Sequence, residues 1–221
     1  MTGTAARLPI VILISGRGSN MRVIAELAAK GELPVTVGAV ISDQPEAAGL
    51  ATAAAMGIPT ATLSPRSYAD RASFDTALAH LVAKYQPGLI VLAGFMRILT
   101  PNFIAAFADR IFNIHPSLLP KYRGLHTHRR VLQAADALHG VSVHFVTEEL
   151  DGGPTIIQAC LEVRPDDTEA TLSARVQRQE HRIYPQAIEW FARGRLQLRD
   201  HGAWLDGKPL DAPVMVDARG T

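Results

Sequence analysis

The chain has 221 residues, of which 48% are hydrophobic and 19% are charged. These fractions are typical of globular proteins, so they exclude a chain that is disordered throughout. The length predicts one domain of about 200 residues with a short appendage. We therefore expect a main domain over residues 1–200, followed over residues 201–221 by a hairpin or tail that packs on it.

Positive and negative residues nearly balance, because 22 lysines and arginines minus 21 acidic residues leave a net charge of +1. This balance argues against a nucleic-acid partner bound by a broad basic surface. The apolar run over residues 8–14 is far shorter than the ~20 residues that span a bilayer, so we expect no membrane partner. The single cysteine, Cys160, permits no internal disulfide and is compatible with the reducing cytoplasm, where we expect the protein to act.

Short apolar runs alternate with segments whose apolar residues recur at helical spacing. In chain order the pattern predicts a strand over 8–14, a helix over 21–30, a strand over 35–41, a helix over 45–56, a strand over 58–63, a helix over 70–85, strands over 89–93 and 111–114, a helix over 131–138, strands over 141–146 and 155–163, and a helix over 167–193. The tail from residue 201 reads as a hairpin or loose coil. The alternation predicts an α/β fold with a mostly parallel twisted sheet and helices on both faces.

The loop Ser-Gly-Arg-Gly-Ser-Asn over residues 15–20 follows the first strand. Its glycines let the backbone turn sharply, and Ser19 or Asn20 can cap the next helix. A helix start of this kind favours a phosphate. The loop is neither a P-loop nor a good dinucleotide fingerprint, because no Gly-Lys and no third glycine follow. Taken alone, it is either a capped turn or a monophosphate site.

A second loop begins at Asn113 and His115, at the end of the strand over 111–114. Because these residues are two apart in a strand, their side chains point to the same face. An amide donor beside an imidazole fits a site where an oxyanion develops on a carbonyl, since both can donate to it and imidazole transfers protons near pH 7. The alternative is a capping asparagine and a partly exposed histidine.

A third loop, over residues 147–154, contains Asp151 followed by Gly-Gly-Pro. A carboxylate aimed at His115 would raise the pKa of that imidazole. Spacing alone does not pair the two residues, because they are far apart in the sequence. The alternative is an Asp-Gly turn between two strands.

Several other side chains have plainer interpretations. His144 follows Ser142 on a strand and faces the same side, so both are second-tier pocket residues. His126 and His128 lie close together, but without a third ligand nearby they make a poor metal site, and we expect no metal. Met96 is by residue type more typical of a core than of a ligand contact.

Beyond these loops, the chain resembles the phosphoribosylglycinamide formyltransferase family, the folate-dependent enzymes of purine synthesis. The matching stretches are VILISGRGSNM (11–21), VLAGFMRILTP (91–101), FNIHPSLLPKYRGLHTH (112–128), GVSVHFVTEELDGGP (140–154) and RVQRQEHRIYP (175–185). They fall in the family's order and cover nearly the whole chain. Two residues depart from the family pattern: Arg17 stands at a variable position, and Arg123 stands where some members have proline.

The resemblance implies a Rossmann-like formyltransferase fold and a role for each matching residue. Asn113, His115 and Asp151 correspond to the catalytic residues. The ribose phosphate and glycinamide are expected at Gly18, Ser19, Asn20, Gln177 and Glu180, and the folate at Arg71, Met96, Arg97, Ile98, Leu99 and Asn113.

The reaction that the resemblance implies is formyl transfer from 10-formyltetrahydrofolate, a co-substrate, to the amine of phosphoribosylglycinamide. The amine attacks the formyl carbon directly, and the oxyanion that forms needs positioned donors. We assign that role to Asn113 and His115, with Asp151 orienting His115. The partners are then small molecules, and the enzyme is a monomer or a homodimer that needs no metal.

Three other functions compete with this one. A formyltetrahydrofolate deformylase would carry an extra N-terminal domain, for which we expect no room before residue 8. A methionyl-tRNA formyltransferase would carry a C-terminal tRNA-binding domain, whereas only about 20 residues follow the last predicted helix, and a charge of +1 does not favour tRNA. A non-catalytic nucleotide-sensing module would explain residues 15–20 but not Asn113, His115 and Asp151 together.

Overall fold

The computed structural model describes residues 6–217. The chain forms two compact units: the first extends to Phe112 and includes Ala192–Gly194, and the second holds Asn113–Phe191 and the residues from Arg195 onward. The predicted α/β class is confirmed, because most strand pairs are parallel and helices accompany the strands. Within residues 6–217 no helix is long and apolar enough to cross a membrane.

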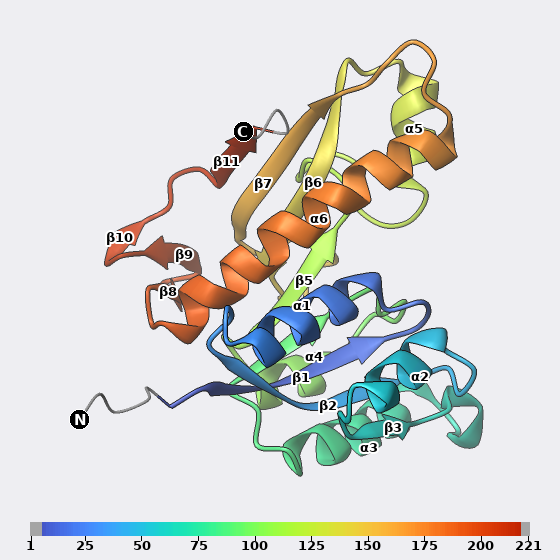
Figure 1. Cartoon of the computed structure of the whole chain (residues 1–221), viewed down its shortest axis with the longest axis vertical. Coiled ribbons are helices and arrows are strands. Elements are labelled where there is room, and N and C mark those ends of the chain that lie inside the picture. The colour runs from blue at the N-terminus through green and yellow to red at the C-terminus, as the bar shows by residue number, and fades with distance from the viewer. Residues whose placement is uncertain (1–5, 218–221) are drawn as a thin grey trace. The chain divides into compact units, whose positions relative to one another are not determined.

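The first unit contains four strands in the order β4-β1-β2-β3, with every pairing parallel. They are β1 (Leu8–Ile14), β2 (Val35–Ser42), β3 (Thr60–Thr62) and β4 (Leu89–Leu92), and Figure 1 shows β1, β2 and β3 side by side. Ile12 of β1 lies opposite Val40 on one side and Val91 on the other. β1 and β4 are almost continuously apolar because strands of a parallel sheet are buried on both faces.

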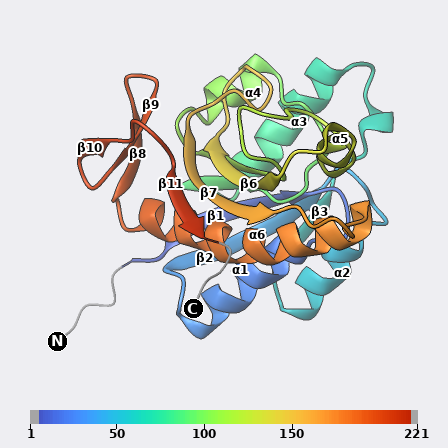
Figure 2. The ribbon, with the colours of Figure 1, turned by 90° about the horizontal axis from the view of Figure 1, so that it is seen from above.

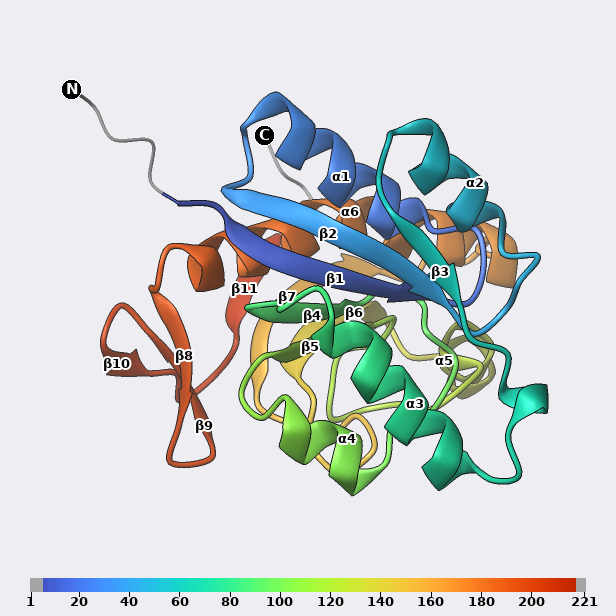
Figure 3. The same ribbon diagram turned by 90° about the horizontal axis from the view of Figure 1, so that it is seen from below.

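Helices cover both faces of this sheet. Figures 2 and 3 show α1 (Ser19–Lys30) and α2 (Ala48–Ala55) on one face, and α3 (Arg71–Ala83) and α4 (Pro101–Ala106) on the other. A short 3₁₀ turn, η1 (Pro65–Ser67), precedes α3. In α1 the buried residues Met21, Ile24 and Ala28 recur at the spacing that predicts a helix.

The second unit orders its strands as β11-β7-β6-β5. The chain enters this unit within β5 (Ile111–His115), and β6 (Leu138–Phe145) and β7 (Thr155–Glu162) follow as an antiparallel pair. β11 (Val214–Asp217) then pairs in parallel with β7. The β6–β7 pair gives the unit a long ribbon with a loop at residues 146–154 at one end.

Two helices and a small sheet complete this unit. α5 (Thr127–Ala134) precedes β6, and α6 (Glu169–Ala192) runs beside β6 and β7 in Figures 1 and 2. β8 (Leu196–Arg199), β9 (Gly202–Leu205) and β10 (Lys208–Pro209) form an antiparallel sheet of their own.

One predicted helix extends too far, and two elements were not predicted. The helix predicted over 131–138 is α5, which ends at Ala134 because Ala135 adopts a left-handed conformation with φ 52°; β6 then begins at Leu138. The sequence pattern missed α4, whose six residues are too few to show a helical period although Thr100 caps it. It also missed β11 in the tail, because a four-residue edge strand gives little signal in a segment rich in glycine and proline.

Gly140 supplies a test of how tightly β6 packs on β7. A Cβ at this position would lie 2.0 Å from the carbonyl oxygen of Ala159 and 2.7 Å from Cδ2 of Leu118. We predict that Gly140→Ala lowers the free energy of unfolding by about 1–3 kcal/mol or more, because overpacking forces the backbone to shift. Urea unfolding followed by circular dichroism measures this change.

Gly202→Ala is the matched control, since the atom nearest to its Cβ would be the Arg199 carbonyl oxygen at 3.7 Å, an ordinary contact. Equal stability of the two alanine variants would contradict the close approach of β6 to β7.

Candidate active site

The structure brings the three predicted catalytic residues together within the second unit. Asn113 and His115 come from β5, and Asp151 comes from the loop between β6 and β7. One carboxylate oxygen of Asp151 accepts a hydrogen bond from Nδ2 of Asn113 at 3.4 Å. The other oxygen lies 3.4 Å from Nδ1 of His115. The alternation of a strand therefore does place both side chains on the face that meets Asp151.

The backbone around Asp151 is shaped to hold this carboxylate. Asp151 has φ 48°, in the left-handed region, and its Oδ2 accepts from the backbone N–H of Gly124 at 2.9 Å. Gly153 fits only as glycine, because a Cβ would lie 1.9 Å from the carbonyl oxygen of Phe145. The Asp-Gly-Gly-Pro segment is thus more than a simple turn, since it aims Asp151 at β5.

His144 is a fourth member of the cluster. Its Nδ1 lies 2.8 Å from the Phe145 carbonyl oxygen, so Nδ1 carries the hydrogen when the ring is neutral. Its Nε2 then accepts from Nδ2 of Asn113 at 3.1 Å, and it also lies 3.7 Å from Oδ1 of Asp151. Both N–H groups of the Asn113 amide are therefore directed at protein acceptors.

Asp151 is the anionic centre of this cluster. Burial alone would raise the pKa of Asp151, but the contact with His144, the Gly124 N–H donor and the charge of His115 outweigh burial and lower the pKa to about 2. The carboxylate is therefore ionised at neutral pH, where it attracts hydrogen-bond donors and positive charge.

His115 is 5% exposed, and its Nε2 lies 2.8 Å from the carbonyl oxygen of Tyr122. Burial lowers the pKa of His115 below 6.5, although the Tyr122 carbonyl and Asp151 both raise it. As expected from the sequence, the charge of Asp151 raises the pKa of His115. The net shift is nevertheless downward, because desolvation of the imidazolium is the larger effect.

The two neighbours of the His115 ring are both acceptors. A neutral imidazole has one N–H and can satisfy only the Tyr122 carbonyl or the Asp151 carboxylate, whereas an imidazolium satisfies both. Burial favours the neutral ring and the acceptors favour the charged ring. Burial is the larger effect, so the neutral ring is favoured, and this is the form that can accept a proton.

Ser142, predicted as a pocket residue beside His144, does not join this cluster. Its hydroxyl donates to the Ser117 carbonyl oxygen at 2.6 Å and accepts from the Leu119 N–H at 3.0 Å. It also accepts from Nε2 of Gln158 at 2.8 Å. Ser142 and Gln158 hold the chain that follows His115, and a polar residue within the apolar run of β7 was the available signal for Gln158.

In the first unit, the loop over residues 15–20 is tied to two neighbouring strand ends. The Ser15 hydroxyl donates to Oδ1 of Asp43 at 2.6 Å and accepts from the N–H of Met96 at 2.9 Å. The N–H of Ser15 also donates to the Gly94 carbonyl oxygen at 3.0 Å. These bonds place the loop at the carboxyl ends of β1, β2 and β4, where ligands bind in such sheets.

The helix after this loop is not capped as predicted. Gly18 is the capping residue of α1, with φ 70° and no side-chain cap, and Ser19 and Asn20 are already helical. A Cβ on Gly18 would lie 3.1 Å from the Cα of Gly49, so a side chain there would collide with α2. A helix start that lacks a side-chain cap and approaches another backbone closely retains its attraction for an anion.

The segment over residues 96–99 meets Arg71 in the same unit. Nη2 of Arg71 donates to the Leu99 carbonyl oxygen at 3.4 Å, and the Arg97 guanidinium lies 4.7 Å from the centre of the Phe74 ring. Met96 is 66% exposed and Ile98 is 50% exposed. The interpretation of Met96 as a core residue is therefore wrong, and the segment presents apolar side chains at the surface.

Gln177 and Glu180 lie one turn apart on α6, so they share a side of that helix. Of the two histidines that lie close together in the sequence, His128 pairs with His139, with Nδ1 and Nε2 2.9 Å apart. Among residues 6–217, no group of three or more side chains has the geometry of a metal site.

Comparison with known proteins now identifies the family. Residues 8–188 match the model of a family described as formyl transferase. The chain belongs to this family. It is 52% identical over 201 residues to phosphoribosylglycinamide formyltransferase of Escherichia coli, a match that covers 91% of this chain and 95% of that protein. The enzyme of that name from Haemophilus influenzae is 44% identical over the same length.

Solved structures of formyl transferases agree with this assignment. The chain superimposes on phosphoribosylglycinamide formyltransferase from Coxiella burnetii with a TM-score of 0.91 and 47% identity, covering 95% of this chain and 99% of that one. The resemblance found in the sequence is confirmed, and this formyl transferase is an enzyme of formyl transfer.

The opposing effects of burial and of Asp151 on the pKa of His115 can be measured by titration. We expect NMR of the labelled histidine ring to give a midpoint below 6.5 in the unmodified protein. Asp151→Asn removes a charge that raises the pKa of His115, so its midpoint should fall further. Asp109→Asn, an exposed aspartate of the first unit, is the control and should leave the midpoint unchanged. A midpoint that rises in Asp151→Asn would contradict the contact between the two side chains.

Proposed function

We propose that this enzyme transfers the formyl group of 10-formyltetrahydrofolate to the glycinamide amine of phosphoribosylglycinamide, a step of purine synthesis. The observation that carries the proposal is the cluster of Asn113, His115 and Asp151 in a chain that is 52% identical to an enzyme of this name. The cluster contains an amide donor, a buried imidazole and an ionised carboxylate. These groups are suited to an acyl transfer that forms an oxyanion and moves a proton.

Asn113 is the group we assign to the oxyanion. Its two N–H groups point at Nε2 of His144 at 3.1 Å and at Asp151 at 3.4 Å. The contact with Asp151 is long for a hydrogen bond and therefore weak. The N–H group that makes it can turn to the formyl oxygen of the folate at the least cost in free energy. The bond to His144 keeps the amide oriented while this exchange takes place.

His115 and Asp151 move the proton that the reaction displaces. When the amine attacks the formyl carbon, its nitrogen gains positive charge and must lose a proton, while N10 of the folate gains one as the C–N bond breaks. With its Nε2–H on the Tyr122 carbonyl, neutral His115 has its lone pair at Nδ1, 3.4 Å from Asp151, so the His115–Asp151 pair takes up the first proton and returns it to the leaving nitrogen. The ionised Asp151 stabilises the charged ring between these steps.

The remaining residues are assigned to substrate binding. We place the ribose phosphate at Gly18, Ser19 and Asn20, because the start of α1 attracts an anion. The glycinamide end is assigned to Gln177 and Glu180 of α6.

The folate is assigned to Arg71, Asn113 and the segment Met96, Arg97, Ile98 and Leu99. The exposed side chains of Met96 and Ile98 supply apolar surface for its ring system, and the Arg71–Leu99 bond holds the segment's backbone. No step in this scheme uses a metal. We expect the enzyme to act as a monomer or homodimer in the cytoplasm, for which its free thiol at Cys160 is suited.

The function is tested by mixing the protein with 10-formyltetrahydrofolate and following folate absorbance with and without phosphoribosylglycinamide. We expect deformylation only when the glycinamide is present. Loss of the formyl group to water alone would instead identify a hydrolase, and no loss in either mixture would overturn formyl transfer to this acceptor.

The assigned roles predict that single substitutions affect turnover more than affinity. We expect Asn113→Ala to reduce kcat by about 10²–10³-fold, the usual cost of removing one oxyanion donor, with a small change in KM. Asp151→Asn should reduce kcat by a similar order, because the charged His115 loses its stabilising partner. Steady-state kinetics with both substrates varied separates the two parameters.

Asn102→Ala and Asp109→Asn are the controls for these variants, because both residues are exposed and lie outside the assigned site. An Asn113→Ala enzyme with normal kcat and a raised KM would show that Asn113 only binds substrate.

A further inference from the structure

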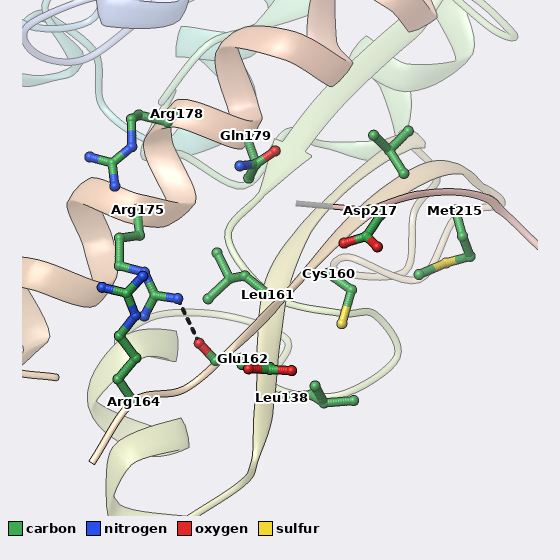
Figure 4. Close-up of a pocket in the computed structure, with 11 residues that line it drawn as sticks. Leu138, Cys160, Leu161, Glu162, Arg164, Arg175, Arg178, Gln179, Met215 and Asp217 are labelled. Atoms are coloured by element: carbon green, nitrogen blue, oxygen red, sulfur yellow. Dashed lines mark hydrogen bonds between the residues drawn. The ribbon is translucent and has the colours of Figure 1, made fainter. Parts of the chain in front are cut away.

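A cavity of about 690 Å³ lies in the second unit, apart from the catalytic cluster. Its walls come from the adjoining ends of β6 and β7, from β11, and from the first half of α6 (Figure 4). Leu138 of β6 pairs with Glu162 of β7 at this end of the ribbon, whereas His144 pairs with Thr155 at the end that adjoins the Asp151 loop. The cavity is within the usual size range of small-molecule sites, roughly 300–1,000 Å³.

One side of the cavity is cationic. Figure 4 shows the guanidinium groups of Arg164, Arg175 and Arg178 on the same side of the view. Arg175 is engaged, because it pairs with Asp167 and donates to the Glu162 carbonyl oxygen at 2.8 Å. Within residues 6–217, the guanidinium groups of Arg164 and Arg178 have no hydrogen-bond or ion-pair partner. Two unpaired guanidinium groups beside a hollow are suited to binding an oxyanion.

The turn that carries Arg164 is held in place by buried charges. The Asp167 carboxylate accepts from the backbone N–H of Arg164 at 2.8 Å and from the side chains of Arg175 and Thr171. The side chains of Asp167 and Arg175 are only 3% and 15% exposed. This network fixes the path of the turn into α6, so the base of the Arg164 side chain does not have to be ordered when a ligand binds.

The other side of the cavity is apolar and acidic. Leu138 and Met215 are exposed apolar side chains, and the carboxylates of Glu162 and Asp217 lie on this side in Figure 4. Carboxylates repel a second anionic group but accept from N–H and O–H donors. The ligand that fits both sides has one anionic end and an uncharged body with donors and an apolar surface.

We propose that this cavity binds a phosphorylated small molecule, with its phosphoryl group between Arg164 and Arg178 and its uncharged body against Leu138 and Met215. The site is separate from the assigned catalytic and substrate residues and does not depend on the proposed function. Arg178 lies on α6 between Gln177 and Glu180, the two residues assigned to the glycinamide.

Cys160 allows the proposal to be tested locally. It lines the cavity, and it is the single cysteine of the chain, so a thiol reagent reports on this cavity alone. Burial raises the pKa of the Cys160 thiol, and the reaction with N-ethylmaleimide is therefore followed at alkaline pH. Adenosine monophosphate is the probe, because it combines a phosphoryl group with an uncharged body, and adenosine is the same body without the phosphoryl group.

We expect adenosine monophosphate to slow alkylation of Cys160 in a saturable way, and adenosine to have no effect. Replacing one arginine, as in Arg178→Ala, should weaken the protection about tenfold, as is usual for a lost hydrogen bond to a charged group. Arg164→Ala/Arg178→Ala should lose the protection altogether. Arg66→Ala is the control, because Arg66 is an exposed arginine of the first unit, and it should keep full protection.

Three outcomes would overturn the proposal: no protection by adenosine monophosphate, equal protection by adenosine, or unchanged protection in the double variant. Circular dichroism and thermal unfolding of each variant show that it is folded. Both arginines are exposed, so we expect these measurements to match the unmodified protein.

Discussion

The arrangement of the catalytic cluster depends on one buried carboxylate, that of Asp151. Its two oxygens receive Asn113 on one side and Gly124 and His115 on the other. An ionised carboxylate in a buried position is tolerated only when donors surround it, so each of these groups is held in place by the same charge. The charge thus joins β5, the segment that follows it and the β6–β7 loop, which are distant in the sequence.

The parallel sheet and the catalytic residues could be predicted from the sequence, because each is indicated by a pattern of neighbouring residues. Asn113 and His115 share a face because a strand alternates, and the glycines after Asp151 indicate a constrained backbone. The apolar runs of β1 and β4 indicate a parallel sheet because such strands are buried on both faces. These signals lie within a few residues of the feature that they predict.

What the sequence could not show depends on long-range packing. Nothing in the sequence indicates that the Tyr122 carbonyl faces His115, or that burial outweighs Asp151 in setting the pKa of that ring. The cap of α1 is Gly18 rather than Ser19, in a left-handed conformation and close to Gly49 of α2, and α5 ends at the left-handed Ala135. Backbone groups and close approaches of this kind have no residue-type signature.

The β6–β7 ribbon has a different chemistry at each end. The end near Thr155 carries the Asp151 loop, where buried polar groups satisfy one another around a negative charge. The end near Glu162 carries the arginine-lined cavity, where two guanidinium groups make no hydrogen bond or ion pair with the described residues. Unpaired guanidinium groups do little for the stability of a fold, since exposed charges contribute little even when paired. Their position beside a hollow is therefore better explained by a ligand than by folding. The same helix, α6, lines that hollow and carries Gln177 and Glu180.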